Sequence, residues 1–338
     1  MQGIAVLGSG AWGTTLACGL AHKGLPVTLW EYQPERAAAM QRDRENATFL
    51  PGITLPAGVT VTAHLPSAVS GAAVVIFVAP SQRMRANAAQ AAAFISPAAS
   101  VISCSKGLEL GTLARMTEIL RAELPPGPRE RLAALSGPNL AREIAEGKPA
   151  ASVVASADPA TARLMQDLFA SQRLRVYSTD DVVGVELGGT LKNVIAIAIG
   201  GADGLGFGDN TKATLMTRGL AEIVRLAVAE GANPMTLAGL AGLGDLIATC
   251  SSPLSRNYSL GRELAATRRS LADVLGARHS VAEGVVTARA AVAMAARHGI
   301  EMPIAQALCA FFDGADAHAL VAALMQRDAR PERDALAG

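Results

Sequence analysis

Lys192 is the one charged residue in the long apolar segment GGTLKNVIAIAIGG. A lysine in such surroundings is costly to bury unless it has a partner or a chemical task. Loss of solvent would lower its pKa toward values at which an amine exchanges protons near neutral pH. We therefore predict that Lys192 is a general acid/base. The alternative is a lysine whose flexible chain carries its charge out to solvent.

Asp245 has a similar apolar setting, in AGLGDLIATC. A buried carboxylate requires a cation, and Lys192 is the natural candidate. The alternative is that Asp245 caps a helix at the glycine turn before it. Thr249 follows one helical turn later on the same face, so we expect it beside Asp245.

The segment SRNYSLGRE places Ser255, Arg256 and Asn257 together at a predicted helix start. An arginine and two polar donors at a helix N-terminus are well suited to hold a phosphate. We therefore predict an anion site there. The alternative is a capped helix on the surface of the protein.

Two polar loops follow apolar runs that we interpret as parallel strands. Lys106 follows VISCS, in SKGLE, and Gly137 and Asn139 follow a second run, in SGPNLA. Open α/β sheets bind ligands beyond the carboxyl ends of such strands, so we expect both loops to line one crevice. The alternative for Lys106 is an ordinary surface lysine.

The N-terminal segment IAVLGSGAWGTTLA carries Gly8, Gly10 and Gly13 in GxGxxG spacing. The first glycine permits the tight turn, the second lets the backbone approach a pyrophosphate, and the third permits close packing of helix and strand. The free N–H groups and the dipole of the following helix favour the anion. The motif predicts a bound dinucleotide; the alternative is an ordinary glycine-rich turn.

Glu31 and Tyr32 directly follow the second predicted strand, at the position where an acidic residue contacts the ribose of NAD. A carboxylate there accepts hydrogen bonds from the ribose diol and repels the 2′-phosphate of NADP. Arg36 could swing in to pair with that phosphate, and Tyr32 could stack on the adenine of either cofactor. We expect a preference for NAD with NADP still used. The alternative is that Glu31 is a solvated loop residue.

The elements that carry these residues change character along the chain. Short apolar runs without alternation are typical of strands buried on both faces, and helical segments separate them. The sequence predicts an α/β fold: an N-terminal Rossmann-like doubly wound parallel sheet followed by an all-α domain. The predicted strands are 4–7, 27–30, 59–62, 74–78, 101–104 and 132–135, with 153–154 and 174–177 extending the sheet.

From about residue 180 only helical patterns remain. The predicted helices are 180–201, 210–230, 255–267, 283–298 and 305–312, after 11–23 and 34–42 in the first half. We assign residues 1–179 to a dinucleotide-binding domain. Residues 180–338 are assigned to a helical domain that binds substrate and carries the catalytic residues.

Composition excludes several classes of protein. Among 338 residues, 50% are hydrophobic, and 30 basic residues balance 29 acidic ones, so a strongly basic nucleic-acid-binding protein is excluded. The four cysteines lack CxxC spacing and the five histidines are scattered, which indicates reduced thiols and no metal site. The N-terminus lacks the basic region of a signal peptide, and polar residues or proline interrupt the uncharged stretches 63–82 and 86–105. We expect a cytoplasmic protein without membrane insertion.

In their order and spacing these motifs resemble those of the bacterial type of NAD(P)-dependent glycerol-3-phosphate dehydrogenase. The resemblance extends to about residue 325 and rests on GSGAWGTTLA, NATFLPG, SKGLE, SGPNLAREIAEGKPA, GVELGGTLKNVIAIAIG, GLGFGDNTKA, AGLGDLIATC, SRN and the pair Glu283–Gly284. It implies reversible reduction of dihydroxyacetone phosphate to sn-glycerol 3-phosphate, which supplies phospholipid biosynthesis. It also implies a Rossmann domain, a helical domain and a homodimer.

The resemblance implies roles for individual residues. Lys192 would be the acid/base at the C2 oxygen, with Lys106 as a second lysine at the substrate. The implied companions of Lys192 are Asn193, Asp245 and Thr249; the implied substrate contacts are Gly137, Asn139, Ser255, Arg256 and Asn257; and the implied cofactor contacts are Ala11, Trp12, Lys106, Ala141, Arg256, Val281 and Glu283. Asn139 and Ala11 depart from the family, which more often has Ser or Thr at the first position and Ser at the second.

Two other functions fit the same scaffold. One is a dehydrogenase with a Rossmann half and a helical half that acts on a 3-hydroxy acid or an acyl-CoA. The SRN motif and the lysine pair argue against it. The other is a nucleotide sensor without catalysis, for which both site lysines would be dispensable.

Overall fold

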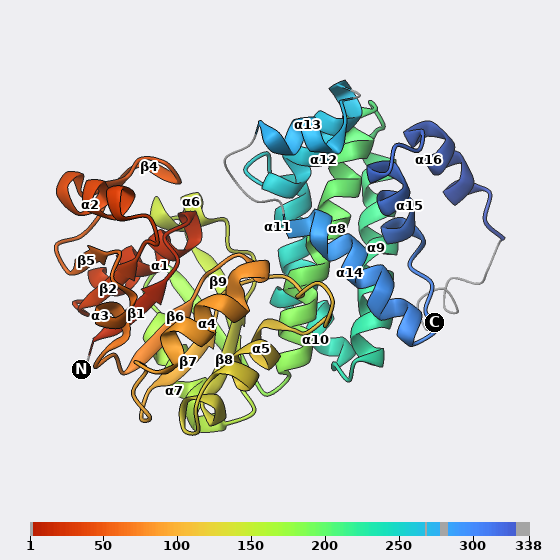
Figure 1. Cartoon of the computed structure of the whole chain (residues 1–338). Helices are drawn as coiled ribbons and strands as arrows, with labels where there is room; N and C mark the ends of the chain where they lie inside the picture. The colour runs from red at the N-terminus through yellow and green to blue at the C-terminus, as the bar shows by residue number, and fades with distance from the viewer. Residues whose placement is uncertain (1–2, 268, 278–282, 329–338) are drawn as a thin grey trace. The chain divides into compact units, whose positions relative to one another are not determined.

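The computed structural model describes residues 3–267, 269–277 and 283–328, and Figure 1 shows their helices and strands. The chain divides into two units, the first made of Met1–Ser105 with Ala114–Val182 and the second of Lys106–Leu113 with Val183–Gly338. The predicted division of function between 1–179 and 180–338 stays a prediction. It does not anticipate that Lys106–Leu113 joins the helical unit.

The first unit is built on an eight-stranded sheet with strand order β10-β9-β8-β7-β6-β1-β2-β5. Its strands are β1 (Ile4–Leu7), β2 (Val27–Trp30), β5 (Val59–Thr62), β6 (Val74–Phe77), β7 (Ser100–Ser103), β8 (Leu132–Ser136), β9 (Ala150–Ala155) and β10 (Leu174–Thr179). Its helices are α1 (Ala11–His22), α2 (Pro34–Asp43), α3 (Leu65–Val69), α4 (Met84–Ala92), α5 (Met116–Glu123), α6 (Ala141–Ala145) and α7 (Pro159–Phe169).

Both faces of this sheet are covered by helices. On β1, Ile4 and Val6 join a core with Leu16 of α1, whereas Ala5 and Leu7 join a second core with Met84 of α4. Successive side chains of a strand point to opposite faces, so a strand between two cores must be apolar at every position. This confirms the interpretation of buried strands for β1, β6, β7 and β8, which are buried throughout. It is wrong for β5 and β10 at the two edges of the sheet, which alternate between buried and more exposed residues.

One strand pair contradicts the predicted parallel sheet. β8 and β9 pair antiparallel, with Leu135 opposite Val154, while all other neighbours in the sheet are parallel. The connection between them contains only the 5-residue α6, which is too short to cover the sheet as the helix of a parallel crossover does. The small antiparallel pair of β3 (Glu45–Asn46) and β4 (Leu50–Thr54) was not predicted from the sequence.

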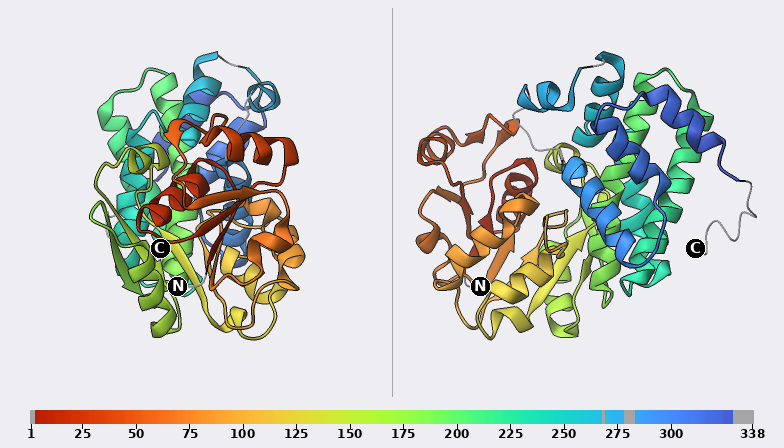
Figure 2. Two further views of the ribbon diagram at one scale, coloured as in Figure 1. Left: turned by 90° about the vertical axis from the view of Figure 1, so that its left-hand side faces the viewer. Right: turned by 45° about the vertical axis from the view of Figure 1, so that its right-hand side comes forward.

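In the second unit, the described residues from 183 onward contain helices and no strand, as predicted. The helices are α8 (Val182–Gly204), α9 (Asp209–Ala229), α10 (Pro234–Ala238), a π-helical turn (Leu240–Gly244), α11 (Asp245–Ser251), α12 (Arg256–Thr267), α13 (Leu271–Gly276), α14 (Glu283–Arg297), α15 (Pro303–Phe312) and α16 (Ala317–Met325). Figure 2 shows these helices from two further sides.

Helix α8 is the central helix of the second unit. By length and composition it could cross a membrane, but 83% of its most apolar window is buried inside the protein, as expected of the core helix of a helical domain. Glycines bring α12 close to it: a Cβ at Gly200 would lie 2.0 Å from the Tyr258 carbonyl oxygen, and one at Gly261 would lie 2.0 Å from that of Ile197. This close approach sets the N-terminal turn of α12 beside the middle of α8.

Glu222 is a buried carboxylate that caps α15. It lies on α9, is 2% exposed, and accepts hydrogen bonds from the backbone N–H groups of Ile304 at 2.7 Å and Ala305 at 3.4 Å. Burial raises its pKa to about 7, although these two bonds and the nearby Arg225 and Arg218 act in the opposite direction. The cap is therefore protonated in part near neutral pH.

This carboxylate predicts a pH-dependent stability. Because its pKa is higher in the folded protein than its ordinary value of 4.5, the folded state binds more protons, and stability falls as pH rises from about 4.5 to 7. Glu222→Gln should remove this loss, on the order of 3 kcal/mol at most, so the variant should be more stable than wild type at high pH and similar near pH 5. Urea midpoints across this range measure it, with the exposed Glu301→Gln as control. A pH-independent difference would contradict the prediction.

Candidate functional site

Two lysines share one buried carboxylate in the second unit. Lys192 Nζ lies 2.5 Å from Asp245 Oδ1, and Lys106 Nζ lies 2.6 Å from Asp245 Oδ2. Lys192 also donates to Thr249 Oγ1, which lies 3.3 Å from Asp245 Oδ1. The ion pair between Lys192 and Asp245 that the sequence predicted is present. The catalytic role of either residue stays a prediction.

The surroundings of Lys192 make it suitable for proton transfer. Lys192 is 7% exposed and Asp245 1%. Burial lowers the pKa of Lys192 to about 8; Asp245 acts against this shift and the ammonium group of Lys106 adds to it. An amine with such a pKa both gives and takes a proton near physiological pH. The alternative of a lysine reaching solvent is wrong.

A π-helical turn presents Asp245 to the lysines. Leu240–Gly244 forms this turn, and Asp245 is the first residue of α11 directly after it. A Cβ at Gly188 of α8 would lie 2.7 Å from the Ala241 carbonyl oxygen, so the turn packs directly on the helix that carries Lys192. Such turns recur at functional sites. The helix-cap alternative for Asp245 is wrong because its carboxylate is taken up by the two ammonium groups.

The predicted phosphate site begins α12 as expected, but its residues differ in accessibility. Arg256 is exposed, whereas Ser255 and Asn257 are 5% and 8% exposed. Ser255 Oγ accepts from the Tyr258 N–H at 3.2 Å, which is a helix cap. Asn257 Nδ2 donates to Asn193 Oδ1 at 2.9 Å. Asn257 therefore joins the first turn of α12 to α8 beside Lys192.

Of the two last predicted cofactor contacts, Val281 and Glu283, the structure describes Glu283. Glu283 is the first residue of α14, and the N–H of the following Gly284 donates to Asn257 Oδ1 at 3.1 Å. Val281 lies outside the described residues. Asn257 thus links α8, α12 and α14 through both ends of its amide.

The glycine loop of the first unit has the geometry that a dinucleotide requires. Gly8 has φ +127°, and a Cβ at Gly13 would lie 1.9 Å from the Gly8 carbonyl oxygen. A Cβ at Gly10, in contrast, would meet nothing within 4 Å, so the backbone is open to a ligand there. Gly10 precedes α1 and gives no side-chain cap to its N-terminus, which leaves N–H groups for an anion.

Side chains around the loop support the same interpretation. Trp12 Nε1 is buried and has no hydrogen-bond partner among the described residues. Asn46, which is 0% exposed, donates to the Ser9 carbonyl oxygen at 2.6 Å and fixes the loop. Thr15 Oγ1 donates to the Ala141 carbonyl oxygen at 3.1 Å, which holds that predicted contact residue against α1. The residues present therefore fit a nicotinamide dinucleotide.

Glu31 is a buried carboxylate with several partners. It is 2% exposed, and it accepts from the Ser9 hydroxyl, from the Gln33 N–H at 2.9 Å and from Arg36 Nη2 at 2.9 Å. The alternative of a solvated loop residue is wrong. The sequence did not indicate that the hydroxyl of Ser9, inside the glycine motif, would bind this carboxylate.

Arg36 is held in place by rings as well as by charge. Its guanidinium lies 5.6 Å from the centre of the Tyr32 ring and 5.0 Å from that of Phe49, within the range of cation–π contacts. Its Nε is buried without a hydrogen-bond partner among the described residues. Tyr32 itself is 64% exposed, so one aromatic face near the nucleotide loop remains accessible.

The loop after β8 carries the other predicted substrate contacts. Gly137 has φ +135°, and its Cβ would lie 3.0 Å from the Ser152 Cα, so only glycine fits. Asn139 Oδ1 accepts from Ser152 Oγ at 2.7 Å, while its Nδ2 is buried and unpartnered within the described part of the chain. An unsatisfied buried donor is costly, which is consistent with a ligand group at this position.

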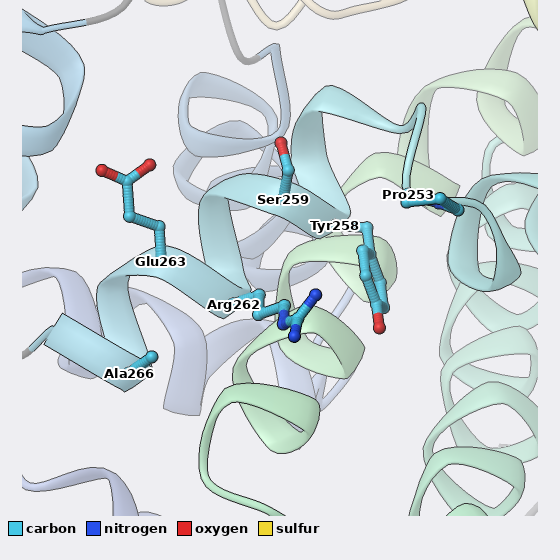
Figure 3. A pocket seen from close by; sticks show the side chains of 6 residues that line it. All are labelled: Pro253, Tyr258, Ser259, Arg262, Glu263 and Ala266. Carbon is cyan, nitrogen blue, oxygen red and sulfur yellow. The ribbon is translucent and has the colours of Figure 1, made fainter.

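A shallow pocket on α12 contains none of the predicted site residues. It measures about 260 Å³ and is lined by Pro253, Tyr258, Ser259, Arg262, Glu263 and Ala266. Figure 3 shows Glu263 pointing away from Tyr258 and Arg262. The Tyr258 hydroxyl donates to Asp203 Oδ2 at 2.8 Å, so its polar group is used in packing. We assign no function to this pocket.

Comparisons with known proteins agree along the whole chain. Residues 3–162 match the family model described as NAD-dependent glycerol-3-phosphate dehydrogenase N-terminus, and residues 181–321 match that of its C-terminus. Glycerol-3-phosphate dehydrogenase [NAD(P)+] of Geobacter metallireducens is 49% identical over 331 residues, which are 98% of each chain. The protein of the same name from Thermobifida fusca is 48% identical over 335 residues, 98% of this chain and 99% of the relative.

A solved structure shows the same fold. The crystal structure of glycerol-3-phosphate dehydrogenase from Coxiella burnetii superposes with a TM-score of 0.91 at 35% sequence identity, covering 96% of this chain and 99% of that one. The similarity thus includes both the sheet of the first unit and the helices of the second.

Proposed function

The chain belongs to the family of NAD-dependent glycerol-3-phosphate dehydrogenases, and from that premise we propose that it interconverts dihydroxyacetone phosphate and sn-glycerol 3-phosphate with NAD(P)H. It is an oxidoreductase. The observation that carries the assignment is the pair of ammonium groups on Asp245. This cluster brings a proton and positive charge together, and carbonyl reduction needs both.

Lys192, Lys106 and Asp245 of the second unit have different roles in the reduction. A bound nicotinamide dinucleotide supplies the hydride. Lys192 uses two of its three N–H groups on Asp245 and Thr249, and the third is directed to the C2 oxygen of the substrate, to which it gives its proton. Lys106 adds positive charge beside the developing alkoxide. Asp245 keeps both ammonium groups in place.

The remaining contacts bind and orient. Ser255, Arg256 and Asn257 at the start of α12 hold the substrate phosphate, and Gly137 and Asn139 are assigned as further substrate contacts. Residues 1–179 form the dinucleotide-binding domain and 180–338 the substrate domain. Gly8, Gly10, Ala11, Trp12 and Gly13 hold the pyrophosphate at α1, with further cofactor contacts from Lys106, Ala141, Arg256, Val281 and Glu283.

Substrate assays test this function against its rivals. Purified protein should oxidise NADH or NADPH, followed by absorbance, when dihydroxyacetone phosphate is added. A 3-hydroxy acid supplied with NAD+ or NADP+, or a 3-oxoacyl-CoA supplied with NADH or NADPH, should give no reaction. Turnover with those compounds alone would favour the other dehydrogenase class, and binding of cofactor without any turnover would favour a sensor.

The cofactor preference rests on Glu31. Its carboxylate lies at the end of β2, where it accepts from the ribose diol of NAD and opposes the 2′-phosphate of NADP. Arg36 neutralises part of this charge, since its Nη2 lies 2.9 Å from Glu31 Oε1, and this pairing accounts for continued use of NADP. We infer a preference for NAD with measurable use of NADP.

Glu31→Gly should shift the preference toward NADPH. The change removes the repelling carboxylate and releases Arg36 to pair with a 2′-phosphate. We expect the ratio of kcat/KM for NADPH to that for NADH to rise roughly tenfold or more, the effect of one hydrogen bond to a charged group. Initial rates with both cofactors measure this ratio, and Glu35→Gln on the exposed side of α2 is the control. A wild type that prefers NADPH, or an unchanged ratio, would refute the role of Glu31.

The setting of the enzyme follows from the same assignment. Its product supplies phospholipid biosynthesis. The protein is expected in the cytoplasm as a homodimer, without membrane insertion and without nucleic acid as partner. Size-exclusion chromatography with light scattering measures the oligomeric state.

A further inference from the structure

Thr190 links the two lysine-bearing parts of the second unit. It lies on α8, two residues before Lys192, and is 2% exposed. Its Oγ1 accepts a hydrogen bond from the Gly107 N–H at 2.9 Å. Since Gly107 directly follows Lys106, this bond ties the segment with one ammonium group to the helix with the other.

The backbone at Gly107 decides where Lys106 points. Gly107 has φ +148°, a conformation that residues with side chains rarely adopt. The hydrophobic anchors of the segment, Leu108 and Leu113, belong to the core of the second unit but come after this turn. The bond to Thr190 therefore fixes the peptide adjacent to Lys106, and without it a buried N–H would lose its partner.

We propose that Thr190 is a positioning residue that holds Lys106 on Asp245. It acts through the peptide between Lys106 and Gly107, whose N–H donates to its hydroxyl. One helix thus carries Lys192 directly and Lys106 through a hydroxyl, so both ammonium groups reach opposite oxygens of one carboxylate, at 2.5 and 2.6 Å. This inference rests on the proposed function of the two lysines.

If Thr190 positions Lys106, its hydroxyl also influences the pKa of Lys192, which a residue that only fills space would not do. The lowered pKa of Lys192 is due mainly to burial, and the ammonium group of Lys106 lowers it further. If Lys106 leaves Asp245, that repulsion weakens and the whole carboxylate is available to Lys192. The pKa of Lys192 then rises, and the pH dependence of turnover must move with it.

The experiment compares three buried substitutions in the active enzyme. Thr190→Val keeps the shape of the side chain and removes the hydroxyl. It should lower kcat/KM for dihydroxyacetone phosphate about tenfold or more. The fall in the rate of reduction at alkaline pH should move to higher pH. Thr190→Ser keeps the hydroxyl and should restore the wild-type profile. Thr287→Val is the matched control, because Thr287 is 0% exposed and its Oγ1 has no hydrogen-bond partner among the described residues.

A double-mutant cycle tests whether Thr190 acts through Lys106. In a Lys106→Met background, Thr190→Val should cost almost nothing more, since coupled residues are not additive. An undiminished second loss, or a Thr190→Val single variant with the wild-type pH profile, overturns the inference. Thr190→Ala runs in parallel as a second variant without the hydroxyl, judged by the same shift. A wild type inactive on dihydroxyacetone phosphate would overturn the proposed function itself, whereas an active wild type with unaffected variants overturns this inference alone.

Discussion

Replacing Lys192 with methionine is expected to lower kcat by at least about 10²-fold, the lower end of what a general acid contributes. Methionine fills a similar volume without a charge. Asp245 keeps Lys106 as its partner at 2.6 Å, so the variant is not left with an unpaired buried carboxylate, which would itself be strongly destabilising. The loss should therefore appear in turnover and not in folding.

The pH profile gives the same residue a second test. Reduction requires the protonated amine and oxidation the neutral one. Because the pKa of Lys192 is lowered to about 8, the rate of reduction should fall as pH rises through about 8. The rate of glycerol 3-phosphate oxidation should rise over the same range. Initial rates in both directions across pH measure these limbs.

Cofactor binding and a surface lysine provide the controls. Lys192→Met should bind NADH as wild type does, measured by fluorescence titration, because Lys192 is not among the proposed cofactor contacts. Lys148→Met removes a lysine that is 56% exposed and paired only with Glu146 among the described residues; it should retain wild-type kcat. Near wild-type turnover of Lys192→Met would refute the assignment of the acid.

The sequence predicted the central strands of the first unit closely because β1 and β6 are apolar and buried at every position. The edge strand β5 is recognisable for another reason, since its valines are buried while its threonines are not. β2 and β5 begin and end at the predicted residues. The direction of β9 could not be predicted in the same way, since a short apolar run has the same pattern whether its strand is parallel or antiparallel. The direction of β9 depends on the short connection through α6, and the sequence alone does not show where that helix ends.

The site shows a similar division. Lys192 and Asp245 could be paired from the sequence because each is a lone charge in an apolar run. A buried charge is costly unless it is paired with an opposite one. The place of Lys106 on the second oxygen of Asp245 could not be predicted. It depends on Lys106–Leu113 belonging to the second unit although the chain on both sides of it belongs to the first. Strand and loop patterns do not show to which unit such a segment belongs.

Hydroxyls were the main signal that sequence analysis missed. Ser9 stands in the glycine motif and Thr190 in an apolar helix, where each resembles a small filler residue. In the structure Ser9 donates to Glu31 and Thr190 accepts from Gly107. A hydroxyl gives no periodicity and no charge, so its partner becomes known only when the fold brings the two together.

Arg256→Ala is expected to lower kcat/KM for dihydroxyacetone phosphate roughly ten- to hundredfold, the range for hydrogen bonds between ionised groups. Arg256 is the exposed member of its trio. Ser255 Oγ is used as acceptor in the cap, although its proton can still be donated, and Asn257 is engaged by Asn193 and Gly284. Most of the charge that a phosphate meets at this helix start therefore comes from Arg256.

The phosphate-free substrate separates this role from a general defect. Dihydroxyacetone lacks the group that Arg256 binds, so its kcat/KM should be nearly the same in wild type and variant. Arg262→Ala provides the matched control, since Arg262 lies on the same helix and its side chain is 62% exposed; it should leave both substrates unaffected. An equal loss on both substrates in Arg256→Ala would show that the arginine does not bind the phosphate.

Inorganic phosphate tests the binding of the anion alone, because it can occupy the phosphate site but cannot react. If α12 holds the phosphate through its N-terminus and Arg256 together, inorganic phosphate should compete with dihydroxyacetone phosphate in the wild type. Its inhibition constant should rise in Arg256→Ala by about the same factor by which kcat/KM falls, because both report the same contact. A large fall in kcat/KM with an unchanged inhibition constant would instead mean that Arg256 acts after binding, on the orientation of the substrate toward Lys192.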